Sequence, residues 1–237
     1  SNTFHYLLLN SKEGEKAREY LKKRNVSSEM IELFQLGYAP SNKDWLYSFL
    51  SGKGYSPTFL NQSGLFSQKS DKWPLFRGRL MFPIRDRQGR TIAFSGRDLT
   101  GDERAPKYIN SPETTIYQKK ENYFGLYEAK NTIAEGKIGP ILCEGNFDVV
   151  AMHQAGYTSA IASLGTSFTN EQCANIKKWY PNNQVFNILF DSDAAGQKST
   201  ERALLIINRN GFEQRVHKLT TAKDASELLE REGEEGV

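Results

Sequence analysis

The sequence of 237 residues is poor in the residue types that bind zinc or form disulfides. It contains two cysteines, Cys143 and Cys173, neither of which has a CxxC partner, and three widely separated histidines. This pattern indicates neither a zinc site nor a disulfide framework, so no zinc is expected in this chain. Both cysteines are expected to be buried thiols in the reducing cytoplasm.

Other absences exclude whole classes of function. No apolar run is long enough for a signal peptide or a membrane span, so no membrane association is expected. There is no GxxxxGK[ST] loop, which excludes P-loop ATPase or helicase activity in this chain. The chain opens with Ser1-Asn2 rather than with Met. We therefore expect a fragment of a longer protein, truncated at its C-terminal end as well.

Charge divides the chain into two halves. The formal net charge is +3, but residues 1–130 carry 21 Lys and Arg against 14 Asp and Glu, whereas residues 131–237 carry 10 against 14. A basic half beside an acidic half suggests that one holds a polyanion and the other holds metal ions. A helix is expected at 122–136, and Gly136 and Gly139 end it. We place the domain boundary there, giving a basic N-terminal domain at 1–136 and an acidic domain at 137–237.

From residue 140 onward, short apolar runs alternate with helix-forming stretches. Strands are expected at 140–144, 158–163, 184–190 and 212–218, with helices at 146–156, 169–180 and 194–210. Continuous apolar runs of this kind are typical of buried parallel strands. The earlier half predicts helices within 3–36 and 44–60 and a polar loop at 61–75. The predicted fold class is α/β: a parallel-sheet domain with helices on both faces, preceded by a basic mixed α+β subdomain.

Two of the apolar runs end abruptly in acids. One is closed by Glu144-Gly145 and the other by Asp191-Ser192-Asp193. Asp148 follows Glu144 by four residues, a spacing that puts both on one helix face if the helix starts at Gly145. Carboxylates that converge at the strand ends repel one another unless cations neutralise them, and hard oxygen ligands suit Mg²⁺ or Mn²⁺. Any one of these acids is also explained as a helix N-cap. It is their combination that favours a metal site.

The basic half centres on residues 72–120, which hold eleven Lys and Arg against five acids. Gln88-Gly89 predicts a hairpin turn between strands near 80–85 and 91–97. Arg77, Arg79 and Arg97 frame this hairpin and suit bidentate phosphate binding. Lys107-Tyr108 pairs a cation with an aromatic ring, which suits a nucleic-acid backbone and a stacked base. A solvated sheet face is the alternative, and the residues alone leave both open.

These motifs resemble a known family. Glu144-Gly145 followed by Asp191-Ser192-Asp193 resembles the TOPRIM signature of primases and topoisomerases. The segments EGNFDVVAMHQAGYTSAIASLGTS, FDSDAAGQKS, LMFPIRDRQGRTIAFSGR and PKYINSPET resemble the catalytic RNA-polymerase core of bacterial DnaG-type DNA primases. The resemblance covers nearly the whole chain, and its motifs are specific. It implies a TOPRIM domain at 137–237 and a template and nucleotide groove in the basic subdomain.

The resemblance also implies roles for individual residues. The expected catalytic residues are Glu144, Asp191 and Asp193. Two or more Mg²⁺ or Mn²⁺ ions would be held by Glu144, Asp148, Asp191, Asp193 and Asp224. Template and nucleotides would be bound by Arg24, Arg77, Arg79, Arg97, Lys107, Tyr108 and Lys119. Ser226 departs from the family pattern, which usually has a second Asp there, so an outer metal is expected to bind more weakly.

The implied function is DNA-templated synthesis of short RNA primers from NTPs during DNA replication, by metal-assisted nucleotidyl transfer. Expected partners are a single-stranded DNA template, NTPs, the RNA primer, and a replicative helicase contacted through a region absent from this chain. We expect a monomer in the cytoplasm, at the replication fork. The alternatives are a TOPRIM topoisomerase or nuclease, and a non-catalytic single-stranded-DNA-binding module. The PKYINSPET and MFPIRD segments favour a primase over the first, and the intact acids weigh against the second.

Overall fold

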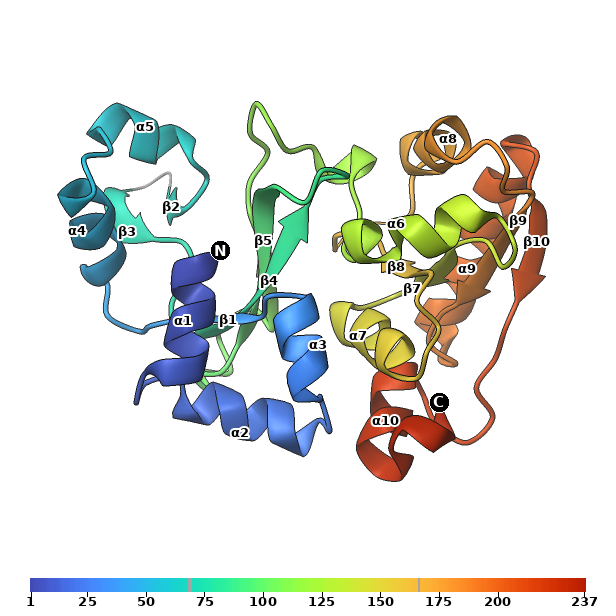
Figure 1. Ribbon diagram of the computed structural model, residues 1–237, viewed down its shortest axis with the longest axis horizontal. Coiled ribbons are helices and arrows are strands. Elements are labelled where there is room, and N and C mark those ends of the chain that lie inside the picture. The colour runs from blue at the N-terminus through green and yellow to red at the C-terminus, as the bar shows by residue number, and fades with distance from the viewer. Residues whose placement is uncertain (68–69, 166) are drawn as a thin grey trace. The chain divides into compact units, whose positions relative to one another are not determined.

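The computed structural model describes residues 1–67, 70–165 and 167–237 (Figure 1). The chain divides into two compact units, each built from segments that are distant in the sequence. The antiparallel unit comprises residues 1–21, 35–84 and 91–118, and the parallel unit comprises residues 22–34, 85–90 and 119–237. Each unit has its own sheet and its own core.

The antiparallel unit is organised around a four-stranded sheet with the order β1-β4-β5-β6. Its strands are β1 (Gly37–Ala39), β4 (Arg79–Arg85), β5 (Thr91–Asp98) and β6 (Tyr108–Asn110). β1 pairs antiparallel with β4, and β6 pairs antiparallel with β5. The predicted turn between β4 and β5 is confirmed, because the Gly89 N–H donates to the Asp86 carbonyl at 2.9 Å and Gly89 has a φ of +85°.

Helices and a two-stranded sheet complete this part of the chain. They are α1 (Asn2–Asn10), α2 (Glu15–Lys23), α4 (Trp45–Gly52), α5 (Pro57–Gln62), β2 (Phe66–Ser67) and β3 (Ser70–Pro74). The core is aromatic: the Phe4 ring lies edge-on to Phe94 at 5.3 Å and to Trp45 at 5.8 Å. In β4 every residue except Arg85 is buried, so this strand is covered on both faces.

The parallel unit contains a second four-stranded sheet, with the order β10-β9-β7-β8 and all neighbours parallel. Its strands are β7 (Ile141–Cys143), β8 (Ala160–Ala162), β9 (Val185–Leu189) and β10 (Glu213–Val216). The helices are α3 (Ser28–Leu33), α6 (Leu126–Glu135), α7 (Asn146–Gln154), α8 (Asn170–Trp179), α9 (Ala194–Arg209) and α10 (Ala225–Glu232), with short 3₁₀ turns at Lys119–Glu121 and Glu234–Gly236.

Helices cover both faces of this parallel sheet, as the sequence predicts (Figure 1). On one face Leu142, Ile161 and Phe186 of the strands pack with Leu126 of α6 and Ile176 of α8 in one cluster. Continuous apolar strands need cover on both sides. The expected alternation of strand and helix from residue 140 is therefore confirmed.

Two strand regions differ from the prediction. Residues 61–75, expected to be a polar loop, contain β2 and β3, and Gly37–Ala39, which lies between the two regions expected to be helical, forms β1. Phe66 explains the first difference, because its side chain is buried and lies edge-on to Tyr47 at 5.9 Å. A single buried aromatic among polar residues gives no periodic signal. β1 is buried along its whole length against β4, a contact distant in the sequence.

The boundary after residue 136 stays a proposal. The helix α6, which precedes it, packs into the core of the parallel unit through Leu126, Ala129 and Ile133. None of the helices in the described part of the chain has the length and apolarity that crossing a bilayer requires.

Candidate active site

The strand order creates a topological switch point in the parallel sheet. From β7 the chain moves to β8 on one side, returns to β9 on the other side and continues outward to β10. The carboxyl ends of β7 and β9 therefore lie side by side, with Cys143 paired with Leu189. Open parallel sheets bind ligands in the crevice outside such a point. Glu144 follows the last residue of β7 directly, and Asp191 lies two residues after the end of β9.

Glu144 and Asp191 are in contact across this edge. The backbone N–H of Asp191 donates to Glu144 Oε2 at 3.4 Å. Burial raises the pKa of Glu144, and the charge of Asp191 raises it further. Burial also raises the pKa of Asp191, although its hydrogen bond with Lys223 opposes this shift. Both carboxylates thus lie where negative charge is costly unless a cation is near.

Asp193 and Lys223 supply the next part of the site. Asp193 Oδ1 caps α9 by accepting from the N–H groups of Ala195 at 3.0 Å and Gly196 at 2.9 Å. Lys223 Nζ lies 3.0 Å from Asp193 Oδ2 and 3.0 Å from Asp191 Oδ2. Hydrogen bonds from the Gly196 N–H and from Lys223 lower the pKa of Asp193. The two aspartates therefore already share a cation, which is part of the chain.

Asp148 lies deeper, in the first turn of α7, and is only 8% exposed. Its Oδ2 accepts from the Gly145 N–H at 3.0 Å and its Oδ1 accepts from the Ser226 N–H at 3.2 Å. Burial, followed by the charge of Asp224, raises the pKa of Asp148 to about 7. Asp224 itself caps α10 by accepting from the Glu227 N–H at 2.7 Å. The first turn of α7 and the N-cap of α10 therefore bring Asp148 and Asp224 close together.

Arg24 joins this acidic group from a segment early in the chain. Its guanidinium donates to Ser226 Oγ at 3.1 Å, lies 3.5 Å from Glu230 and stacks over the Phe147 ring at 5.4 Å. Ser226 therefore offers its hydroxyl to Arg24 and its N–H to Asp148, and adds no carboxylate to the acidic group. The expected phosphate contact of Arg24 stays a prediction.

The donor set fits a hard divalent cation. Glu144, Asp191 and Asp193 offer only oxygen atoms, and two of them already bind an ammonium group. Oxygen donors on a partly solvated edge suit Mg²⁺ or Mn²⁺. Within residues 1–67, 70–165 and 167–237, no three His, Cys, Asp or Glu side chains are already arranged around one metal position. Mg²⁺ is commonly held by one or two carboxylates and water, and Asp191 and Asp193 already converge on one cation.

A cavity of about 310 Å³ adjoins Glu144 in the same unit. Ser163, Ser199 and Arg202 contribute to its lining. Ser199 and Arg202 are three residues apart on α9, a helical spacing that puts both on one side. Gly165 and Ser167 also line this cavity, and Thr166 between them lies outside the described residues.

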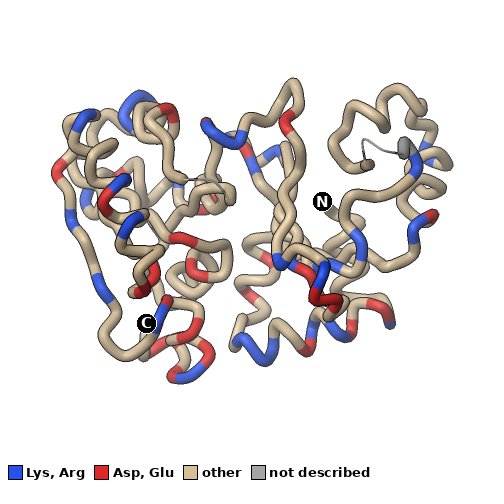
Figure 2. The backbone as a smooth tube through the Cα atoms, turned by 180° about the vertical axis from the view of Figure 1, so that it is seen from behind, with Lys and Arg blue, Asp and Glu red and all other residues tan. Residues whose placement is uncertain are grey.

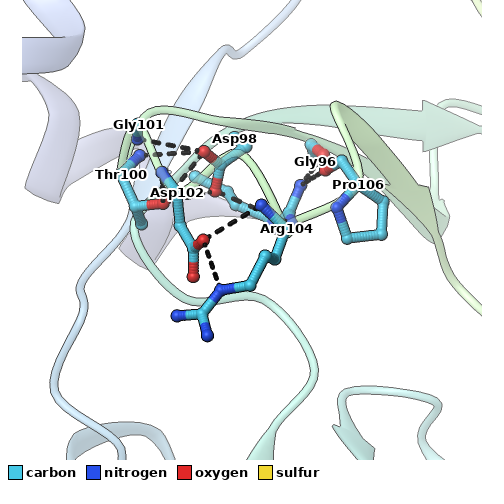
Figure 3. A network of polar contacts seen from close by, with 8 residues as sticks. Gly96, Asp98, Thr100, Gly101, Asp102, Arg104 and Pro106 are labelled. Atoms are coloured by element: carbon cyan, nitrogen blue, oxygen red, sulfur yellow. Dashed lines mark hydrogen bonds and ion pairs between the residues drawn. The ribbon is translucent and has the colours of Figure 1, made fainter.

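The basic side chains of the antiparallel unit differ in how they are placed. Lys and Arg positions are spread over its helices, hairpin and loops, and they alternate with acids along α2 (Figure 2). Arg79 is 5% exposed and donates to the carbonyls of Gly96 and Pro106, at 3.0 Å in each case. It also lies 3.7 Å from Asp98, which hydrogen-bonds the start of the loop 99–106 (Figure 3). Arg79 therefore fixes this loop from inside.

Arg97, Lys107 and Tyr108 lie together at one edge of the antiparallel sheet. Arg97 of β5 is directly paired with Tyr108 of β6, and Lys107 precedes Tyr108. The Arg97 guanidinium stacks between two rings, 4.9 Å from Tyr20 and 5.4 Å from Tyr108, and donates to the Tyr108 hydroxyl at 3.3 Å. Stacking of this kind fixes the guanidinium plane. It leaves a cation and an aromatic ring at a sheet edge beside the exposed Lys107.

The remaining predicted contacts divide between the units. Arg77 is exposed and lines a cavity of about 280 Å³ with Asp98 and Asp102 in the antiparallel unit. Lys119 belongs to the parallel unit, where its carbonyl accepts from Gln172 at 3.4 Å. The predicted metal ligands all belong to the parallel unit. Their roles in binding stay predictions.

Lys223 is the site residue that sequence reasoning missed. It stands next to Asp224, and a lysine beside an acid in a polar loop is usually a solvated pair. The one available signal was its position two residues before α10, in the loop that returns to the acidic edge. Only the pairing of β9 with β10 brings that loop to Asp191.

Comparison with known proteins assigns both regions of the chain. The family described as "DNA primase catalytic core, N-terminal domain" matches residues 4–130, and a Toprim-like family matches residues 141–229. The DNA primase of Treponema pallidum is 39% identical over 237 residues, which is 100% of this chain and 38% of that protein. The DNA primase of Enterococcus faecalis is 39% identical over 240 residues, covering 98% of this chain and 37% of that protein.

Solved structures agree with this assignment. The RNA polymerase domain of Mycobacterium tuberculosis primase DnaG matches with a TM-score of 0.88 and 32% identity, over 98% of this chain and 77% of that one. A DnaG primase catalytic domain bound to ssDNA matches with a TM-score of 0.85 and 36% identity, over 99% of this chain and 73% of that one. The chain spans less than two fifths of the length of the curated relatives named above. It belongs to the DnaG-type DNA primase family, over the region formed by the N-terminal domain of the catalytic core and a Toprim-like domain.

Proposed function

We propose that this chain is the catalytic core of a primase, a nucleotidyltransferase that makes short RNA primers on single-stranded DNA. The observation that carries the proposal is the pair of carboxylates, Asp191 and Asp193, that shares one cation at the switch point beside Glu144. Nucleotidyl transfer needs anionic ligands for metal ions at such an edge. The family match over both halves of the chain supports the same reaction.

In this reaction the 3′-oxygen of the primer forms a bond with the α-phosphorus of an incoming NTP. The bond between that phosphorus and the bridging oxygen breaks, and pyrophosphate leaves. When bound, Mg²⁺ or Mn²⁺ would neutralise phosphate charge and favour the ionised 3′-hydroxyl. Asp191 and Asp193 would hold it, with Asp148 and Asp224 as further candidates.

Glu144 has a distinct role in this proposal. Through its contact with the Asp191 N–H it orients the loop between β9 and α9. Its raised pKa also suits it to hold a proton during transfer. Both functions need the carboxylate at the end of β7.

The template contacts are assigned to the antiparallel unit. Arg97, Lys107 and Tyr108 would bind backbone phosphates and a stacked base, as expected for single-stranded nucleic acid. The relative whose structure holds ssDNA supports DNA as the template. NTPs as substrates, a helicase contact outside this chain, a monomeric state and a cytoplasmic location are further parts of the proposal.

The experiment is primer synthesis on single-stranded DNA with NTPs and Mg²⁺ or Mn²⁺. Asp191→Asn should lower the rate by about 100-fold or more, in the range for losing one strong transition-state stabiliser, with DNA affinity nearly unchanged. Glu201→Gln, an exposed acid on α9, is the matched control and should keep full activity. Equal loss of DNA binding and of synthesis in Asp191→Asn would contradict the assignment.

The alternatives make different predictions in the same assay. A Toprim topoisomerase or nuclease would cleave DNA, and a topoisomerase would leave a trapped covalent complex. A non-catalytic binding module would bind DNA without making RNA. The match of residues 4–130 to the primase core favours primer synthesis over both.

A further inference from the structure

Lys223 is held in place from both sides of its backbone. Its carbonyl accepts from the Ser192 N–H at 3.1 Å, and its own N–H donates to Glu227 Oε2 at 2.8 Å. The first bond ties the loop before α10 to the loop that carries Asp191 and Asp193, and the second ties Lys223 to the first turn of α10. The backbone position from which the ammonium group reaches the two carboxylates is therefore set by the fold.

The oxygen that Lys223 contacts on Asp193 is the one that a metal would have to use. Asp193 Oδ1 is occupied by the N–H groups of Ala195 and Gly196 at the start of α9. Oδ2 is thus the atom left to face outward, and Lys223 Nζ lies 3.0 Å from it. A cation bound by both aspartates must displace the ammonium group from this oxygen.

Displacement is feasible because the lysine is poorly protected. Its side chain is 50% exposed, and the Asp193 side chain is 46% exposed. Ion pairs between exposed groups contribute little free energy. A divalent cation has twice the charge of an ammonium group, so at sufficient concentration it wins the competition for the carboxylates.

We propose that Lys223 is an internal cation that competes with the divalent metal for Asp191 and Asp193 and so sets the metal concentration at which the centre loads. Without metal, Lys223 offsets the repulsion between the carboxylates. With metal, its side chain is released from both. The inference rests on the proposed metal site, and it assigns a positioning role to Lys223 and no step in the chemistry.

Mn²⁺ binding to the metal-free protein, measured by the electron paramagnetic resonance of free Mn²⁺, tests the competition. Lys223→Met should bind the first Mn²⁺ about five- to tenfold more tightly than the wild type, because two surface ion pairs no longer oppose it. Lys223→Arg should retain weak binding. Lys218→Met, which removes an exposed lysine from the same loop, should change the affinity by less than about twofold, because the ion pairs described for Asp191 and Asp193 are with Lys223.

A second measurement follows the lysine itself. In the NMR spectrum of lysine side-chain ammonium groups, a signal absent from Lys223→Arg identifies Lys223. Adding Mg²⁺ should move it to the position of a solvated lysine. Failure of the wild type to bind Mn²⁺ would overturn the metal site itself. If the wild type binds Mn²⁺ but Lys223→Met matches Lys218→Met, or if Mg²⁺ leaves the Lys223 signal unchanged, the competition is refuted and the proposed function stands.

Discussion

Among the predicted metal ligands Glu144, Asp148, Asp191 and Asp193, Asp148 is the one whose carboxyl group is hardest to ionise. Its carboxyl group is buried in the first turn of α7 with Asp224 nearby, and its pKa is raised to about 7 from 3.8. Two backbone N–H groups compensate only in part, because they stabilise the anion in an otherwise poorly solvated place. A divalent cation would remove this cost, so the residue couples metal binding to stability.

This coupling predicts that the stability of the protein depends on pH when EDTA keeps it free of metal. Below about pH 4 the Asp148 carboxyl is protonated in both the folded and the unfolded state. Between about pH 4 and 7 the unfolded chain releases this proton and the folded chain keeps it. The contribution of Asp148 to the free energy of unfolding therefore falls as pH rises, by at most about 1.4 kcal/mol per pH unit.

Urea unfolding of the wild type and Asp148→Asn at several pH values checks this. Asp148→Asn lacks the titration, so its stability relative to the wild type should increase from pH 4 to pH 7 and then level off. Parallel stability curves across this range would show that Asp148 ionises normally.

Single residues were predictable where their position in a motif carried the chemistry. Glu144, Asp191 and Asp193 each follow an apolar run, and parallel strands bring such positions to one edge. Lys223 follows no strand motif, and its partners lie thirty residues or so earlier in the chain. Arg79 was expected near phosphate because it is basic and beside a hairpin, yet its contacts with Gly96 and Pro106 are visible only in the fold.

At the scale of elements, the edge formed by β5 and β6 concentrates the predicted template contacts. Arg97 is fixed between Tyr20 and Tyr108, whereas Lys107 lies beside them on an exposed stretch. The stacked arginine supplies a rigid surface and the lysine supplies a charge. Lys107 should therefore contribute to nucleic-acid binding mainly through its positive charge.

Lys107→Ala should weaken single-stranded DNA binding and reduce the slope of log affinity against log salt by about one unit or less. Fluorescence anisotropy with a labelled oligonucleotide at several salt concentrations gives this slope. Lys43→Ala, an exposed lysine before α4, should leave it unchanged. An identical slope in wild type and Lys107→Ala would remove Lys107 from the template surface.

Helices and strands could be predicted where their own residues form a clear apolar pattern. The strands β7, β8 and β9 follow apolar runs, whereas β10 (Glu213–Val216) is mostly polar and exposed. The structure confirms all four. β1, β2 and β3 are short, and their burial depends on distant partners such as β4 and Tyr47. The sequence of a strand of two to five residues gives no information about such a distant partner.

At the scale of the whole molecule, the chain forms two units, each built from separated segments. The order of motifs along the sequence does not show this division. Phe34 stacks on Phe124 at 5.4 Å and lies edge-on to His153 at 5.0 Å, although these residues are far apart in the sequence. All three belong to the parallel unit. The family matches lie in consecutive segments, residues 4–130 and 141–229, whereas each compact unit combines segments that are distant in the sequence.

A fragment of residues 137–237 should therefore fail to unfold cooperatively. It lacks α6, whose Leu126 and Ile133 are buried in the core cluster. Losing the burial of each such side chain costs about 1.5–3 kcal/mol and uncovers the core residues that they contact. A fragment of residues 119–237 restores α6 and should show a cooperative transition, at a lower temperature than the full chain. Circular dichroism during heating distinguishes the two. Equally cooperative transitions in both would place the boundary after residue 136.

The contact between Arg24 and Ser226 spans 202 residues, and the one between Asn25 and Leu229 spans 204. During translation at about 5–20 residues per second, the early segment waits roughly 10 to 40 seconds for these partners to leave the ribosome. Phe34, fully buried in the finished protein, has no Phe124 or His153 for much of that time. The speed of the ribosome thus sets the earliest moment at which Ser226 reaches Asp148 and the acidic centre is complete.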